Sequence, residues 1–166
     1  MKKLRDVTLL FLIKKRKGKT ISICLAMKKR GFGSNRWNGV GGKVKEGEFI
    51  EAAAIREAKE EIGVEVNGLK KVAELSFFFP HNPLWNQKVH VYFCKSWIGE
   101  PIETEEMKPE WFFISNIPFK DMWPADIFWI PEVIAEKKVI GSFVFGEGDV
   151  VLEKEVSLVS SFAESI

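Results

Sequence analysis

Residues 41 to 63 constrain the fold of this 166-residue chain more than any other segment. The segment begins with the glycine pair Gly41-Gly42, passes through a short polar stretch, and continues from Phe49 to Ile62 in helix-forming residues. Gly63 follows at the position where a helix C-terminal cap is expected. The pattern predicts a tight, flexible glycine loop that leads directly into one helix.

Three glutamates of the predicted helix, Glu57, Glu60 and Glu61, fall on one face. At about 100° per residue, their positions span an arc of roughly 100°. Like charges so close together repel, so they are found on a solvated surface or around a cation. Hard divalent ions such as Mg²⁺ prefer oxygen ligands and bridge readily to phosphates. Taken alone, the three glutamates leave a solvated acidic face as the simpler interpretation.

The neighbours of the three glutamates favour a metal site instead. Glycines at 41 and 42 allow the backbone to approach a ligand or a metal closely. Arg56 precedes Glu57 directly and lies four residues before Glu60, so it can orient a carboxylate through charge-assisted hydrogen bonds.

The composition indicates one globular domain covering residues 1–166, with 46% apolar and 29% charged residues. A net charge of +2 gives no strong attraction to a membrane or to a nucleic-acid polymer, and no segment has the ~20 apolar residues that span a bilayer. The two cysteines, Cys24 and Cys94, lie in apolar stretches and are expected to be free core thiols. We therefore expect a cytoplasmic protein and a monomer.

The remaining pattern predicts an α/β fold with mixed strands and two main helices. A solvated, basic loop tip at residues 14–19, rather than a nucleic-acid patch, connects the first two strands. Pro124 is placed to begin the second helix. The expected strands are Val7–Ile13, Thr20–Met27, Leu69–Phe79, Lys88–Trp97, Glu110–Ile114, Val139–Phe145 and Val150–Val156, and the second helix is expected over Ala125–Lys138.

The glutamate helix and its loop resemble the Nudix box, the signature of the Nudix hydrolases. All fixed positions of the box match between residues 42 and 64; they are Gly42, Glu48, Arg56, Glu57, Glu60, Glu61 and Gly63. Ala58 departs from the pattern, because the family prefers a larger apolar residue there. The resemblance implies the Nudix α/β/α sandwich and hydrolysis of a nucleoside diphosphate linked to another group.

The resemblance also implies roles for individual residues. Glu57, Glu60 and Glu61 would bind Mg²⁺ or Mn²⁺, with Glu60 or Glu61 as general base and Arg56 orienting a catalytic glutamate. The carbonyl of Gly42 and Glu106, a glutamate outside the box, would complete the metal site. Lys43 either balances phosphate charge or is a solvated loop lysine.

Segments outside the box resemble the oxidised purine nucleoside triphosphatases, the MutT-homologue branch of the superfamily. These segments are 27–33, 36–39, 105–107 and 117–124, and the similarity extends over about residues 7 to 156. The resemblance implies conversion of damaged purine triphosphates to a monophosphate and pyrophosphate, which cleanses the nucleotide pool.

In that branch the purine stacks on a tryptophan that matches Trp123. A flat base needs an aromatic platform, and an asparagine amide offers a donor and an acceptor to the base edge. Without the resemblance, core packing or a solvated loop would explain several of these residues equally well. The other residues that match substrate contacts are Lys28, Phe32, Asn38, Phe77 and Asp126.

One departure concerns the base edge. The branch typically has two successive aspartates after Trp-Pro, whereas this chain has Ala125-Asp126. We expect Asp126 alone to read the purine edge and the tolerance of modified adenines to differ.

Two alternatives compete with this interpretation. The first is a Nudix hydrolase for another substrate, such as a dinucleoside polyphosphate, ADP-ribose or an undamaged triphosphate. The second is a non-catalytic Nudix module that binds nucleotides. The intact glutamates argue against the second, because a pure binding module does not need a repulsive carboxylate cluster.

Overall fold

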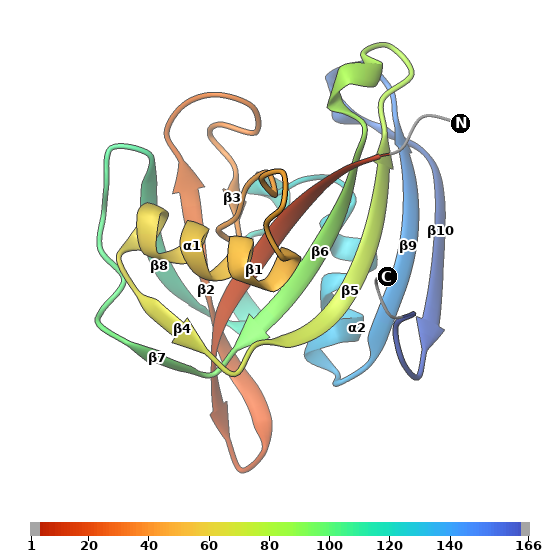
Figure 1. The fold of residues 1–166 in the computed structure, drawn as a ribbon. Helices are drawn as coiled ribbons and strands as arrows, with labels where there is room; N and C mark the ends of the chain where they lie inside the picture. The colour runs from red at the N-terminus through yellow and green to blue at the C-terminus, as the bar shows by residue number, and fades with distance from the viewer. Residues whose placement is uncertain (1–3, 164–166) are drawn as a thin grey trace.

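A computed structural model describes residues 4–163 of the chain, which form a strongly twisted mixed sheet with helices on both faces (Figure 1). Short 3₁₀ turns occur at Pro83–Trp85, Ile114–Asn116, Phe119–Asp121, Asp126–Phe128 and Glu147–Asp149. The strands and helices are β1 (Arg5–Arg16), β2 (Lys19–Lys28), β3 (Trp37–Asn38), α1 (Ile50–Ile62), β4 (Glu65–Asn67), β5 (Lys70–Phe78), β6 (Gln87–Cys94), β7 (Ser96–Ile98), β8 (Met107–Phe113), α2 (Ile130–Ile134), β9 (Lys138–Phe145) and β10 (Val151–Val159).

The main sheet has the strand order β10-β9-β5-β6-β1-β2-β3, and β8 also pairs with β2. Two neighbouring pairs, β1 with β6 and β5 with β9, are parallel, and the others are antiparallel. The short strands β4 and β7 form a separate two-stranded sheet. Three pairs of predicted strands that follow one another along the chain, β1–β2, β5–β6 and β9–β10, are paired antiparallel.

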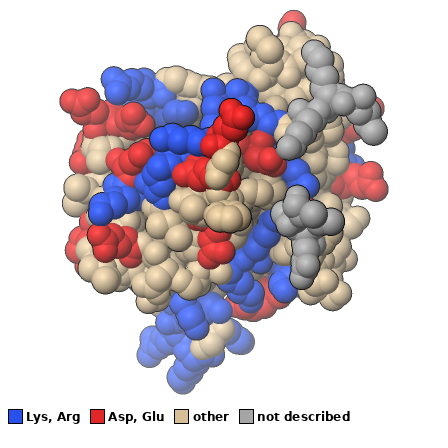
Figure 2. Space-filling model, viewed as in Figure 1, with Lys and Arg blue, Asp and Glu red and all other residues tan. Residues whose placement is uncertain are grey.

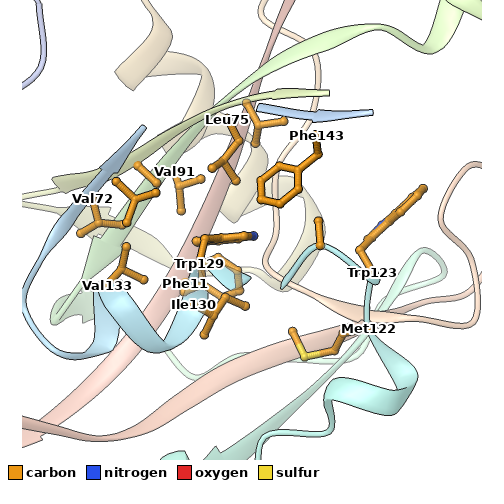
Figure 3. Close-up of a cluster of buried hydrophobic side chains, with 14 of the residues drawn as sticks. Phe11, Val72, Leu75, Val91, Met122, Trp123, Trp129, Ile130, Val133 and Phe143 are labelled. Carbon is orange, nitrogen blue, oxygen red and sulfur yellow. The ribbon is translucent and has the colours of Figure 1, made fainter. Parts of the chain in front are cut away.

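Alternating side chains divide the core into two layers. On β6, Val91 and Phe93 face the cluster that contains α2, while Tyr92 and Cys94 face the cluster that contains α1. Figure 3 shows Trp129, at the N-terminus of α2, lying against side chains from the sheet. Since helices cover both faces, the predicted α/β/α sandwich with a mixed sheet is confirmed.

The second helix is much shorter than predicted. Instead of extending over Ala125–Lys138, the chain forms a 3₁₀ turn at Asp126–Phe128 and then the five-residue helix α2. Pro131 lacks a backbone N–H and fits only the first turn of a helix. Glu136 has a φ of 65°, which ends the helical path. Lys138 then begins β9, since Val139 pairs with Ala73 of β5.

The predicted strand Lys88–Trp97 is likewise two strands. It breaks after Cys94, and β7 turns away from the sheet to pair with β4, which the sequence pattern did not indicate.

Ala58, the residue that departs from the Nudix box, lies in the core. It is fully buried next to Ala54, so the helix packs closely on the sheet despite the small side chain.

Other expectations from composition are also met. Both cysteines are free and buried, and burial raises the pKa of the Cys24 thiol to about 12, so it is protonated at neutral pH. The basic segment at residues 14–19 is exposed as predicted, but the predicted loop is too long, because β1 continues to Arg16 and β2 begins at Lys19, which leaves only Lys17-Gly18 as the turn. In the described part of the chain, no helix is long and apolar enough to cross a membrane.

Candidate active site

The glycine loop is held against strand β1 by backbone hydrogen bonds. Thr8 N–H donates to the Gly42 carbonyl at 2.9 Å, and Leu10 and Val40 exchange a second pair of bonds. A Cβ added at Gly41 would lie 1.8 Å from the Thr8 carbonyl oxygen. Only glycine therefore allows the loop to approach the strand this closely.

The same loop also touches the glutamate face of α1. The Gly41 N–H donates to Glu61 Oε1 at 3.0 Å. A Cβ added at Gly42 would lie 2.7 Å from the carboxyl group of Glu57. The absence of a side chain at 42 thus leaves a small space between a backbone carbonyl and two carboxylates.

Arg56 connects the helix to the loop that precedes it. Its guanidinium donates to both carboxylate oxygens of Glu48, at 2.8 and 3.0 Å, and to Glu57 at 2.7 Å and Glu60 at 3.3 Å. The bonds from Arg56 lower the pKa of Glu48 to about 2, and they raise the pKa of Arg56 itself. Glu48 is therefore the main partner of Arg56, a contact that the sequence pattern did not indicate.

Glu61 is the buried member of the glutamate group, with 4% of the residue exposed. Burial and, second, the neighbouring Glu57 raise the pKa of Glu61 to about 8. Glu60 is different, because its side chain is 56% exposed and turned toward Arg56. Within residues 4–163, the His, Cys, Asp and Glu side chains do not form a group of three or more that could hold a metal ion.

The donor atoms at this position nevertheless fit a divalent cation. They are all oxygens, and the carboxylate of Glu57 lies close enough to the buried carboxyl of Glu61 to raise its pKa. A hard ion would relieve this repulsion. The Gly42 carbonyl accepts a hydrogen bond from the Thr8 N–H at 2.9 Å, and the Thr8 hydroxyl donates to it only at the long distance of 3.5 Å, so one lone pair of this oxygen is weakly engaged.

The structure places Glu106 differently from the helix glutamates. Its side chain is 60% exposed and lies 3.9 Å from the guanidinium of Arg30. The segment around it is tied to α1, because the Thr104 hydroxyl donates to the Glu61 carbonyl at 3.0 Å. Glu106 therefore lies two residues after Thr104, which is bonded to α1, while the carboxylate of Glu106 faces solvent.

A cavity of about 200 Å³ lies beside the glycine loop. Gly41 and Gly42 form part of its wall, so it opens next to the glutamate helix. All seven residues that the sequence indicated as substrate contacts line this one cavity, although they come from distant segments: Lys28, Phe32, Asn38, Lys43, Phe77, Trp123 and Asp126.

Aromatic rings form one side of the cavity. Trp123 is largely buried, and its ring centroid lies 5.2 Å from that of Phe32, tilted by 43°. Phe77 contacts Phe143 and Phe145 edge to face, so it contributes both to the core and to the cavity wall. The arrangement offers a flat base an aromatic surface in which Trp123 is largely buried and Phe32 is 40% exposed.

Two polar side chains in the cavity have free hydrogen-bonding capacity. Asp126 is 3% exposed; its Oδ1 accepts from Trp129 Nε1 at 3.2 Å, whereas its Oδ2 is buried without a partner. Burial raises the pKa of Asp126 to about 7. Asn38 Oδ1 accepts from the Gly39 N–H at 2.9 Å, which leaves the amide NH₂ as a donor.

Several residues of this region had no signal in the sequence. The cavity is also lined by Thr8, Leu9, Gln87 and Met107. The sequence pattern of their strands indicated only core or edge positions for them. Ala125, in turn, is fully buried in the core and does not line the cavity.

Arg36 holds the outer side of Trp123. Its guanidinium carbon lies 4.3 Å from the Trp123 ring centroid, and Nη1 lies 2.9 Å from Asp149 in the β9–β10 turn. Arg36 does not line the cavity, so it acts on the base platform through Trp123. The pair joins two distant turns, which no local sequence pattern could indicate.

Replacing Arg36 with alanine is expected to raise KM several-fold with little change in kcat, because a cation–π contact contributes about 0.5–1 kcal/mol. Steady-state kinetics with a purine triphosphate measures this effect. Arg30→Ala, which removes an exposed arginine nearby, is the matched control. An equal KM for Arg36→Ala and the native chain would contradict the positioning role.

Together, these features define a phosphate-hydrolysing type of site: the glycine loop, the glutamate helix and the cavity beside them. The chain belongs to the Nudix family, because the NUDIX domain model matches residues 3–133. It is 46% identical over 140 residues to the oxidized purine nucleoside triphosphate hydrolase of Mus musculus, covering 84% of this chain and 89% of that protein. The enzyme of the same name from Danio rerio is 44% identical over 135 residues, covering 81% and 85%.

Solved structures show the same fold. A MutT protein from Bacillus halodurans superposes with a TM-score of 0.78 at 21% identity, covering 92% of this chain and 97% of that chain. A MutT Nudix hydrolase from Burkholderia pseudomallei gives a TM-score of 0.60 at 24% identity, covering 70% and 88%.

Proposed function

We propose that this protein hydrolyses oxidised purine nucleoside triphosphates to the monophosphate and pyrophosphate, and so cleanses the nucleotide pool. The observation that carries the proposal is the cavity in which the unpartnered Asp126 oxygen and the Trp123 ring lie beside the Gly41-Gly42 loop. Two similar relatives are named as hydrolases of this substrate class.

The reaction needs a divalent cation, and we propose Mg²⁺ or Mn²⁺ held by Glu57, Glu60, Glu61 and the Gly42 carbonyl. When bound, such an ion neutralises phosphate oxygens and lowers the pKa of a water molecule. Arg56 keeps the carboxylates of Glu57 and Glu60 in place through its bonds at 2.7 and 3.3 Å.

The other residues of the site bind and orient the substrate. Lys28 and Lys43, on the cavity wall, balance the charge of the phosphates. The carboxylate of Glu61 accepts the proton of the attacking water. Without a cation, burial and the neighbouring Glu57 raise the pKa of Glu61 to about 8, so the carboxyl is mostly protonated at pH 7; a bound cation would favour the carboxylate that accepts the proton.

The base is recognised at the far end of the cavity. Its flat face lies on Trp123, and its edge meets Asp126 Oδ2 and the Asn38 amide. Because the pKa of Asp126 is about 7, this carboxyl can donate or accept a hydrogen bond near neutral pH.

A hydrolysis screen over normal, oxidised and methylated purine triphosphates tests the proposal. Chromatography of the products is expected to show monophosphate and pyrophosphate, with the largest kcat/KM for an oxidised purine. Release of single phosphates would contradict the reaction. Equal kcat/KM values for normal and oxidised purines would contradict the substrate.

Ala125 provides a test of base selectivity. Ala125 is fully buried and does not line the cavity, but it directly precedes Asp126, whose side chain does. We expect Ala125→Asp to change the ratio of kcat/KM for 8-oxo-dGTP over 2-hydroxy-dATP by on the order of tenfold, because a buried second carboxyl beside Asp126 changes the hydrogen bond that Asp126 offers to the base edge. The ratio is measured within each variant, so it is insensitive to the fraction folded. Ala125→Ser, which adds a smaller polar group, is the control. An unchanged ratio in Ala125→Asp would contradict the idea.

We further propose that the chain works as one domain in the cytoplasm. Strands β9 and β10 lie beyond the region matched by the family model, yet β9 pairs with β5 in the main sheet. The two buried, free cysteines support a reducing compartment.

A further inference from the structure

A second cavity, of about 160 Å³, lies on the α2 face of the sheet. It shares strands β1 and β6 with the first cavity, but it lies at their opposite ends. Val7 and Val89 line the first cavity, whereas Ile13 and Phe93 line the second. Leu9 also lines the first cavity, and the four steps along β1 from Leu9 to Ile13 span about 13 Å at ~3.3 Å per residue, so the two cavities are separate.

The rim of the second cavity is strongly basic. Among the described lining residues the charges are five lysines and one acid, Glu136, an excess of four positive charges in a chain whose net charge is +2. The five lysines are Lys15, Lys70, Lys95, Lys137 and Lys138. Such a concentration of like charge on a concave surface costs free energy unless an anion balances it.

Glu136 shows how this rim receives an anion. Its Oε1 lies 3.1 Å from the ammonium of Lys15, and its Oε2 lies 3.5 Å from that of Lys70. The carboxylate therefore bridges a lysine from β1 and a lysine from β5. The rim already holds two oxygens of one anionic group, while Lys95 and Lys138 form no ion pair within residues 4–163.

The floor and the surroundings strengthen the attraction for an anion. The floor consists of Ile13, Val72, Phe93 and Val133, each no more than 6% exposed. An apolar wall lowers the effective dielectric constant beside the lysines, so their attraction for an anion is larger than on an open surface. Figure 2 shows further Lys and Arg side chains gathered on the projecting end of the β1–β2 hairpin, at the bottom of the view. Lys15 of the rim belongs to this hairpin.

We propose that this second cavity binds the di- or triphosphate group of a small soluble molecule, at a site separate from the catalytic cavity. Several lysines around a concave floor suit a compact group with several negative charges. A nucleic-acid strand is the less suitable ligand, because its backbone needs a long groove, whereas this cavity has a volume of only about 160 Å³.

Titration with inorganic tripolyphosphate, with EDTA present, tests the proposal on the full chain. Amide shifts in a ¹H–¹⁵N spectrum separate the two cavities by residue. We expect saturable shifts at Gly68, Lys95 and Lys137, besides any at the Gly41-Gly42 loop. Shifts confined to the catalytic cavity would overturn the proposal.

Three variants sharpen the test. Lys70→Gln combined with Lys95→Gln is expected to weaken binding at the second cavity by on the order of tenfold. Lys108→Gln combined with Lys120→Gln removes the same charge from exposed positions elsewhere and should leave binding unchanged. Glu136→Gln should tighten binding about threefold, because it removes the carboxylate that competes for Lys15 and Lys70.

Three results would contradict the proposal or a part of it. Equal weakening by the control pair would show attraction to net charge rather than to a site. Weaker binding in Glu136→Gln would contradict the role of Glu136 as an internal competitor. Shifts at these amides with a single-stranded oligonucleotide, but none with tripolyphosphate, would show that the basic face contacts nucleic acid instead.

Discussion

Replacing Glu61 with glutamine is expected to lower kcat by about 10²- to 10⁴-fold, the usual contribution of a general base. The amide oxygen of glutamine can still accept the bond that Gly41 N–H donates to Glu61 Oε1, so the loop should remain in place. The variant keeps a side chain of the same size at this buried position but cannot become a carboxylate, so it can neither accept the proton nor bind a cation with a full negative charge. Pyrophosphate release with saturating Mg²⁺ measures the effect.

Two glutamate variants serve as references for this result. Glu65→Gln changes an exposed residue just beyond α1, paired only with Lys59, and should retain native kcat. Glu60→Gln distinguishes the two candidates for the general base, because Glu60 is exposed and Glu61 is buried. A loss of kcat in Glu60→Gln with native kcat in Glu61→Gln would assign the base to Glu60.

Replacing Asp126 with asparagine is expected to raise KM for the preferred oxidised purine by about 10- to 100-fold. An unmet hydrogen bond in a buried site costs about 1–3 kcal/mol. Asparagine can keep the acceptor for Trp129 Nε1, but its NH₂ then occupies the place of Oδ2 and can only donate. The KM of the native protein should change between pH 6 and pH 8, as Asp126 titrates near pH 7, whereas that of the variant should not. Similar pH profiles for the two proteins would contradict this role.

The same substitution should change stability in a pH-dependent way. In the folded chain the pKa of Asp126 is raised from 3.8 to about 7, so its protonated form is favoured by folding. This contribution is complete below about pH 4 and is lost as the pH rises to 7. Asp126→Asn carries no such charge, so its Tm relative to the native chain should rise from pH 5 to pH 8. A constant Tm difference over this range would show that Asp126 does not titrate there.

The catalytic segment could be predicted from the sequence because its elements are local. A glycine pair, a run of helix formers and a capping glycine all act within a few turns of chain, so α1 and its loop follow from residues 41 to 63. Hairpins between neighbouring strands follow from the same kind of pattern. The seven residues predicted as substrate contacts line one cavity; six of them follow from family resemblance, and Lys43 from its place next to the glycine pair.

Long-range contacts determined the parts of the fold and of the site that the sequence did not predict. The second helix ends early because residues after Glu136 pair with β5, about 65 positions earlier in the chain. Arg36 is bonded to Asp149, far along the chain, through side chains whose proximity depends on how whole elements pack. Propensity acts over a few residues, whereas these contacts arise only when distant segments are brought together.

The glutamates on one face of the helix show the same division. Their spacing, and the glycine loop before them, are properties of the sequence alone. Only the tertiary structure decided that Glu61 is buried against the Gly41 N–H while Glu60 faces solvent, because the sheet covers one side of α1. Burial depends on what packs against a residue, so the pKa of Glu61 is raised to about 8 by surroundings that its position in the sequence does not reveal.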